Sequence, residues 1–198
     1  GLSAEYFDVG GVVAALPDLA GRVPSRVGHV ASLNARSVAG ALGPEVVGTR
    51  PVAPYAARYG GWVLVAADGV HTFHLGTDEG ARLTVGGVRV IDMPSNGGVY
   101  REQAADVTLT AGLVRVEVEF FHGSGIGDLH LSIARPGQTR RVVSGAALVT
   151  RSSAVAADEA ELERINTTLW EIEDDIRDQE RAKSFDARFV ELARAVYI

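Results

Sequence analysis

Cysteine is absent from the 198 residues, which excludes disulfide bonds and metal sites built on thiolates. No apolar run reaches the length that spans a bilayer, so membrane insertion is not expected. Basic residues are in deficit, with 19 Lys and Arg against 25 Asp and Glu, and they form no stripe along the chain. Nucleic acid is therefore not an expected partner.

Signatures of catalysis are also missing. The sequence has neither an HExxH zinc motif nor a nucleophile elbow. The glycine-rich stretch 123–127 precedes a strand pattern, whereas a phosphate-binding loop precedes a helix. His71 and His74 lie in a period-two run, where positions i and i+3 face opposite sides, so they do not chelate one metal ion. The sequence predicts a protein that is not an enzyme.

The net charge of −6 is unevenly distributed. Residues 1–157 carry 13 acids and 13 Lys and Arg, whereas residues 158–183 carry ten acids and four Lys and Arg. The hydrophobic pattern changes at nearly the same place. We therefore divide the chain into a neutral domain, residues 1–150, and an acidic tail, residues 151–198.

Short alternating runs separated by glycine turns fill the first 150 residues. The strongest run spans residues 113–121, where Val116, Val118 and Phe120 alternate with Arg115 and Glu117. We expect the three apolar side chains in the core and the two charged ones exposed. Runs of this kind without helical patterns between them predict a mainly β domain, an antiparallel β-sandwich.

One turn is defined by its residues. Gly86 and Gly87 separate the runs 81–85 and 88–91, which predicts a β-hairpin with a two-residue turn. Residues 10–50 have less regular patterns, and we expect loops and short strands there.

The acidic tail has a helical period. Five apolar residues follow spacings of 3, 4, 3 and 4, which predicts an a/d stripe of coiled-coil type: Leu162, Ile165, Leu169, Ile172 and Ile176. A second, shorter helix is predicted after Ser184. So narrow an apolar stripe needs a partner, which is the sandwich itself, a second copy or further sequence. We expect residues 158–197 to mediate a homo-oligomer or attachment to a larger assembly.

Several motifs, in order, resemble the PA-14 (protective-antigen type) domain family. They are Gly1–Phe7, Arg58–Trp62, Ala67–Phe73, Thr77–Leu83, Gly87–Asp92, Ala111–Val116 and Leu129–Leu131. The resemblance covers about residues 1–137, and it implies that the last two motifs form a hairpin. It further implies a β-sandwich of the kind found in bacterial toxins, glycosidase insertions, adhesins and yeast flocculins, often binding glycans. The tail resembles a helical tail of bacterial proteins linked to surface glycans.

The resemblance also suggests a site. Several lectin members of the family hold Ca²⁺ with an Asp-Asp pair, where this chain has Asp78-Glu79 before Gly80. The residues alone leave open a solvated turn in which Asp78 caps its own backbone. With the family, we expect Asp78, Glu79 and Asn96 to bind calcium, because hard cations take oxygen ligands. The same three residues and Tyr100, which stacks on the sugar or packs in the core, form the expected carbohydrate site.

Two functions follow as expectations. The first is a lectin-like module that recognises cell-surface or capsular glycan with the help of calcium, as in adhesion. The alternative is a non-catalytic structural domain of a larger bacterial or phage-like particle, attached or oligomerised through its helices. Both place the protein at a cell surface, in the secreted fraction or on a particle surface.

Overall fold

The computed structural model describes residues 1–11, 14–36, 53–124, 127–144 and 147–149. All of these residues belong to one unit of the chain, Gly1–Glu159. The predicted helical tail, residues 151–198, lies outside the described residues, and its helices and its coiled coil stay predictions. In the part of the chain that is described, no helix has the length and apolar character needed to cross a membrane.

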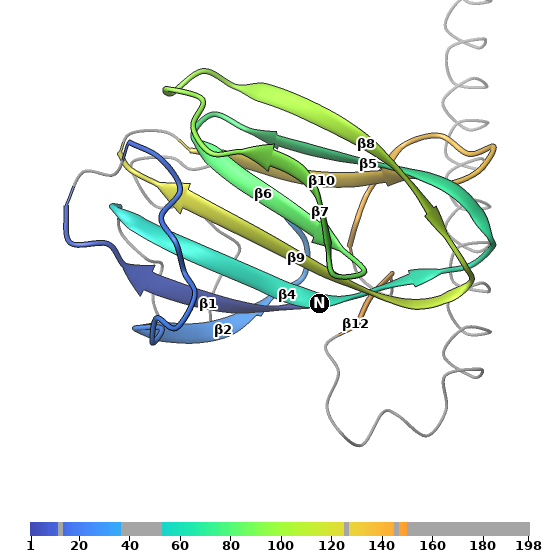
Figure 1. The fold of residues 1–198 in the computed structure, drawn as a ribbon, viewed down its shortest axis with the longest axis horizontal. Coiled ribbons are helices and arrows are strands. Elements are labelled where there is room, and N and C mark those ends of the chain that lie inside the picture. The colour runs from blue at the N-terminus through green and yellow to red at the C-terminus, as the bar shows by residue number, and fades with distance from the viewer. Residues whose placement is uncertain (12–13, 37–52, 125–126, 145–146, 150–198) are drawn as a thin grey trace, which may run out of the picture. The chain divides into compact units, whose positions relative to one another are not determined.

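The described residues form two antiparallel sheets, seen as two layers of arrows in Figure 1. The first sheet, called sheet 1, has seven described strands, and six of them lie in the order β2-β1-β4-β9-β6-β7 with β12 beside β4. Their bounds are β1 (Leu2–Asp8), β2 (Arg26–Val30), β4 (Tyr55–Val65), β6 (Gly80–Val85), β7 (Val88–Met93), β9 (Gly112–His122) and β12 (Leu148–Val149). The long strands β4 and β9 pair over their whole length, from Tyr55 opposite His122 to Val65 opposite Gly112.

The second sheet, called sheet 2, has five described strands, with four in the order β11-β10-β5-β8 and β3 beside β10. Their bounds are β3 (Asn34–Arg36), β5 (Gly69–Thr77), β8 (Arg101–Leu109), β10 (Asp128–Ala134) and β11 (Arg141–Val142). Strands β3 and β11 therefore both flank β10, at its beginning and towards its end. Both lie on the edge of β10 opposite β5.

The alternation of side chains explains why the two sheets pack face to face. In β9, Val116, Val118 and Phe120 are at most 1 % exposed, which confirms the predicted core positions. They join one apolar cluster with residues of sheet 2 such as Phe73 and Leu131. Burying one face of each strand is the main source of stability for such a sandwich. The mainly β, antiparallel fold class is thus confirmed.

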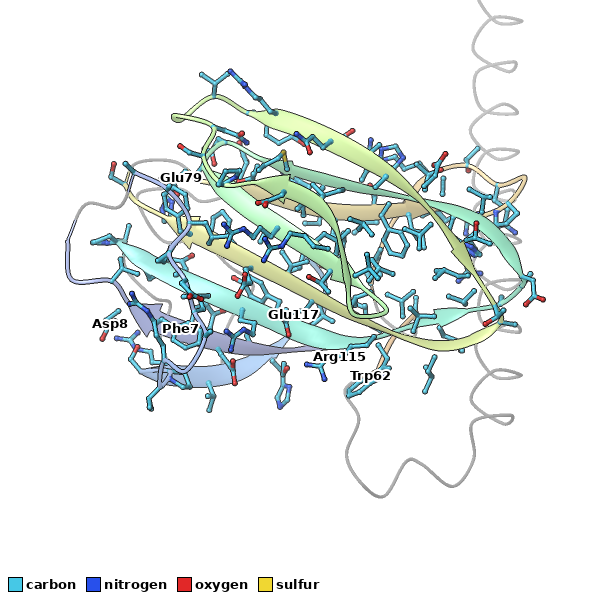
Figure 2. The ribbon with its side chains drawn as sticks, viewed as in Figure 1. Phe7, Asp8, Trp62, Glu79, Arg115 and Glu117 are labelled. Carbon is cyan, nitrogen blue, oxygen red and sulfur yellow. The ribbon has the colours of Figure 1, made fainter. Side chains whose placement is uncertain are left out.

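The outer face of sheet 1 carries a ladder of ion pairs. Arg58 lies 3.2 Å from Glu5 and 3.6 Å from Glu119, and Arg82 lies 2.9 Å from Asp92. Arg115 is exposed as predicted, but the side chain of Glu117 is only 27 % exposed because Arg115 and Arg58 flank it. Figure 2 shows Glu117 beside Arg115 on this face. The prediction of an exposed Glu117 was therefore only partly right.

Two hairpin predictions have different outcomes. Gly86 and Gly87 connect β6 to β7, and both have positive φ values of 58° and 86°, which confirms the predicted turn. The implied hairpin between residues 111–116 and 129–131 is wrong. Strand β9 pairs with β4 and β6 in sheet 1, whereas β10 pairs with β5 in sheet 2. The chain crosses between the sheets at this point.

Candidate functional site

Asp78 and Glu79 connect β5 in sheet 2 to β6 in sheet 1 at one end of the two sheets. They were predicted at a loop tip, but Asp78 is only 6 % exposed and the side chain of Glu79 is 11 % exposed. The connection is two residues long and is covered by two other loops. A solvated turn at this position is therefore excluded.

The Glu79 carboxylate is surrounded by hydrogen-bond donors. Its oxygens accept from the backbone N–H of Gly123 at 2.7 and 2.8 Å and from that of Ser124 at 3.2 Å. The Nδ1 of His122, a ring with no exposed surface, donates to Oε2 at 2.9 Å. Hydrogen bonds to a charged acceptor are stronger than neutral ones. Glu79 therefore braces the end of β9, and its oxygens already have partners.

Asp78 lies in an acidic environment. Its Oδ1 accepts from the backbone N–H of Asp128 at 2.9 Å. Burial raises the pKa of the Asp78 carboxyl, the hydrogen bond from Asp128 opposes this shift, and the negative charges of Glu79 and Asp128 add to the rise. Asp78 is therefore held where its ionised form is disfavoured.

The loop at residues 94–98 closes over the connection. The Nδ2 of Asn96, which is 8 % exposed, donates to the Thr77 carbonyl at 2.9 Å. A Cβ on Gly80 would lie 2.4 Å from the carbonyl oxygen of Pro94, so only glycine allows this close approach. The structure thus brings Asp78, Glu79 and Asn96 together at one end of the two sheets.

These residues fit a calcium ion poorly. Calcium takes about six to eight oxygen ligands, yet both oxygens of Glu79 accept hydrogen bonds and the Asn96 amide nitrogen binds the backbone. Within the described ranges, no group of three or more His, Asp and Glu side chains converges to hold a metal ion. The calcium site stays a prediction.

Tyr100 lies apart from this group, on the outer face of sheet 2. Tyr100 is 46 % exposed, and its side chain covers Gly76 of β5, where a Cβ would meet the hydroxyl of Tyr100 at 2.1 Å. The ring of His130 in β10 meets it edge to face, with 5.9 Å between ring centroids. The core role that the sequence left open for Tyr100 is therefore excluded.

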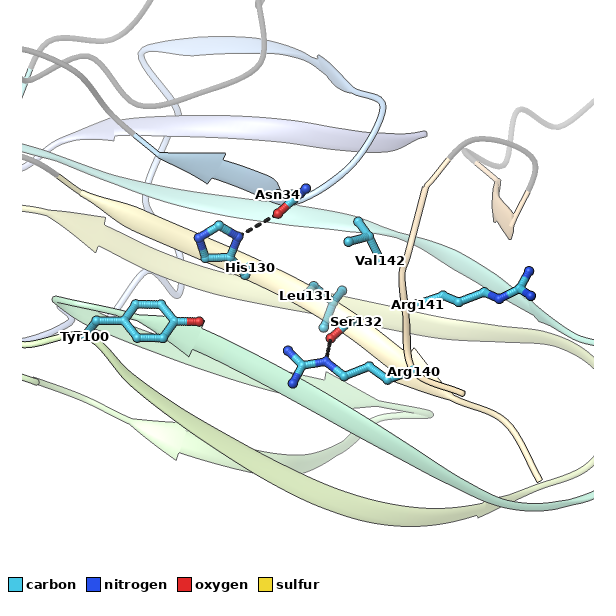
Figure 3. Close-up of a pocket in the computed structure, with 8 residues that line it drawn as sticks. All are labelled: Asn34, Tyr100, His130, Leu131, Ser132, Arg140, Arg141 and Val142. Carbon is cyan, nitrogen blue, oxygen red and sulfur yellow. Dashed lines mark hydrogen bonds between the residues drawn. The ribbon is translucent and has the colours of Figure 1, made fainter. Parts of the chain in front are cut away.

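Tyr100 forms one wall of a pocket with a volume of about 310 Å³. Figure 3 shows the eight residues that line it: Asn34, Tyr100, His130, Leu131, Ser132, Arg140, Arg141 and Val142. They come from the segment before β8, from β3, from β10, and from β11 with Arg140 just before it. Alternation along β10 places His130 and Ser132 on the same outer face.

Hydrogen bonds fix the polar groups of this pocket. The Nδ1 of His130 donates to the Asn34 side-chain oxygen at 2.7 Å, and the Nε of Arg140 donates to the Ser132 hydroxyl at 2.6 Å. Arg140 also makes two bonds to Glu102, at 2.7 and 2.5 Å. These bonds lower the pKa of Glu102 and raise the pKa of Arg140, so both groups are charged at neutral pH. The pocket is therefore preorganised.

The sequence predicted only one residue of the pocket, Tyr100. The alternation in residues 128–134 contained a signal, since it places His130 and Ser132 on one face. No local pattern indicated that Asn34 and Arg140 meet this face. The partners Asn34 and His130 are 96 positions apart in the chain.

Comparison with known proteins agrees with this fold. Residues 51–145 match the family model described as the PA14 domain. No curated protein sequence matches the chain. Among solved structures, a PA14 sugar-binding domain from an RTX adhesin has 18% identity and a TM-score of 0.61, with 77% of this chain and 98% of that chain covered.

Two other solved structures are similar at comparable levels. The A domain of epithelial adhesin 6 from Candida glabrata, in complex with Galβ1-3GlcNAc, has 13% identity and a TM-score of 0.58, with 77% of this chain and 87% of that chain covered. An anti-sigma factor domain-containing protein from Clostridium clariflavum has 23% identity and a TM-score of 0.58, with 76% of this chain covered. The match spans 48% of that chain, so this chain covers about half of its length. At these identities the likeness establishes the fold alone.

Proposed function

We propose that this chain is a non-catalytic, lectin-like module that binds surface glycan in the pocket on the outer face of sheet 2. The proposal depends mainly on one observation: the half-exposed Tyr100 lies beside polar side chains that hydrogen bonds hold in fixed positions. A pocket of about 310 Å³ lies at the small end of ligand sites, which span about 300–1,000 Å³. It suits one sugar ring.

The chemistry of a sugar ring matches these walls. A pyranose has apolar C–H faces and a rim of hydroxyl groups. The face stacks on an aromatic ring such as that of Tyr100, and the rim exchanges hydrogen bonds with the amide of Asn34, the imidazole of His130 and the hydroxyl of Ser132. Because these groups are already ordered, binding costs little conformational entropy. Affinity for one sugar is weak, and multivalency through the tail raises it.

Related structures support the proposal. A solved neighbour is named a sugar-binding domain of an adhesin, and another holds a disaccharide. Such proteins act at surfaces, and we place this chain at a cell surface, in the secreted fraction or on a particle surface. Calcium at Asp78, Glu79 and Asn96 stays a separate proposal, although both Glu79 oxygens already accept hydrogen bonds, and glycan binding that a chelator leaves unchanged would contradict it.

The alternative, an assembly domain of a larger particle, depends on residues 158–197. They lie outside the described residues, so no structural observation favours this function over glycan binding. It predicts self-association of the full chain without any glycan ligand. Analytical ultracentrifugation and the glycan experiment below therefore separate the two functions.

A glycan array probed with the full chain tests the proposal, in calcium and in chelator. Tyr100→Ala should weaken binding about twofold to tenfold, since an aromatic contact contributes about 0.5–1.5 kcal/mol. Tyr100→Phe keeps the ring and should retain most of the binding. Trp62→Ala, on the outer face of sheet 1, serves as the aromatic control and should bind like the wild type. If no glycan binds in either buffer, the proposed function is wrong.

A further inference from the structure

The lining of the sheet 2 pocket is rich in hydrogen-bond donors. Its eight residues include two arginines, of which Arg140 faces the pocket, one histidine, one asparagine and two hydroxyl side chains, but no Asp or Glu. The hydroxyl groups of any sugar both donate and accept, whereas the carboxylate that an acidic sugar adds only accepts. The residue types thus favour a ligand with a negatively charged group.

Arg140 is the group that meets such a ligand. A guanidinium has five N–H donors, and three of them bind Ser132 and Glu102. Two N–H groups remain. Figure 3 shows the guanidinium of Arg140 and the hydroxyl of Tyr100 directed to the same part of the pocket, whereas Arg141 extends away from it. Arginine suits a carboxylate because its planar fork matches two oxygens.

The acids beside Arg140 and His130 already have partners. Glu102 binds Arg140 with both oxygens and lies 3.6 Å from His74, and Asp128 lies 3.7 Å from His130. They position the donors and do not line the pocket. Their negative charge moderates the attraction for an anion, so the preference should be measurable but not large.

Resting on the proposed function, we infer that the pocket selects a hexuronic acid residue of an acidic glycan. The ring stacks on Tyr100, and its carboxylate accepts hydrogen bonds from Arg140. The Asn34 amide, whose oxygen is bound to His130, offers N–H groups to a ring hydroxyl. Arg140 is thus the specificity-determining residue, and the Glu102 pair holds it in place.

Calorimetric titration of the full chain with matched sugars tests this inference. Methyl glucuronide is compared with methyl glucoside, and methyl galacturonide with methyl galactoside, in chelator at about 0.15 M salt. Each pair differs only in a carboxylate replacing a hydroxymethyl group. The uronide should bind about tenfold more tightly, as for one charge-assisted hydrogen bond, and the difference should shrink at high salt.

Variants of Arg140 test whether this residue causes the preference for the uronide. Arg140→Gln should abolish it while neutral sugars still bind, and Arg140→Lys, which keeps the charge without the fork, should retain part of it. Arg115→Gln, on the outer face of sheet 1, should keep the full preference. Melting curves establish that each variant is folded, and Arg140→Lys preserves the test if Arg140→Gln does not fold.

The outcomes separate the inference from the function on which it rests. Equal affinity for the two members of each pair would overturn the acidic selectivity but leave glycan binding intact. A preference that survives in Arg140→Gln would overturn the role of Arg140. If neither pair binds and no glycan binds on the array, both the inference and the proposed function fail.

Discussion

Removing the Glu79 carboxylate should destabilise the domain whether or not calcium is present. In Glu79→Ala, the ring of His122 and the backbone N–H groups of Gly123 and Ser124 lose their acceptor. The exposed Ser124 N–H can form a hydrogen bond with water instead. The His122 ring has no exposed surface, and the Gly123 N–H is half-buried. Since each buried donor left unpaired costs about 1–3 kcal/mol, the loss should be about 2–6 kcal/mol. The melting temperature should fall by about 2–4 °C per kcal/mol.

Urea unfolding followed by circular dichroism measures this loss, in calcium and in chelator. Glu117→Ala is the matched control, because its carboxylate forms ion pairs on the outer face and should contribute about 1 kcal/mol or less. If Glu79 braces the end of β9, the loss is the same in both buffers. A loss equal to that of Glu117→Ala, or one seen only in calcium, would refute this reasoning.

Three further predictions concern the core, pH and the tail. Leu83→Ala should cost about 2–5 kcal/mol in urea unfolding because Leu83 has no exposed surface, whereas Val88→Ala, at 64 % exposure, should cost less than about 0.5 kcal/mol. Burial raises the pKa of the Asp78 carboxyl in the folded state above its unfolded value. The protonated carboxyl therefore contributes stability that is fully present below the unfolded pKa and is lost as pH rises through the folded pKa. The melting temperature of Asp78→Asn relative to wild type should therefore be higher at pH 7 than at pH 3, and the opposite trend would contradict the shift. Ile165→Asp should reduce self-association in sedimentation velocity, and an unchanged sedimentation profile would remove the predicted seam.

The sequence was sufficient for features set by local periodicity. Period-two alternation placed Val116, Val118 and Phe120 in the core because a strand with one buried face must alternate. The two glycines identified the β6–β7 turn because both central residues need positive φ. Local periodicity could not predict which sheet each strand joins, because β8 and β9 are neighbours in the chain but lie in different sheets.

The site was only partly predictable for a related reason. Two acids before a glycine are typical of a solvated turn, and nothing near Asp78 or Glu79 indicates burial. The donors that surround Glu79 lie 43 to 45 residues further along the chain. Tyr100 was identified by residue type, but its partner His130 is brought to it by strand pairing between β5 and β10. Pairing between strands that are distant in the sequence thus forms both the surroundings of Glu79 and the pocket beside Tyr100.

Mapping a bound glycan on backbone amide resonances tests the central claim most directly. The full chain is titrated with the strongest ligand of the array, in chelator, and amide shift changes are followed by NMR. The proposed site predicts the largest changes at residues 34, 100, 130, 132 and 140, with little change on the outer face of sheet 1. Changes confined to residues 78–80 and 94–98, or spread over sheet 1 with none on β10, would contradict it.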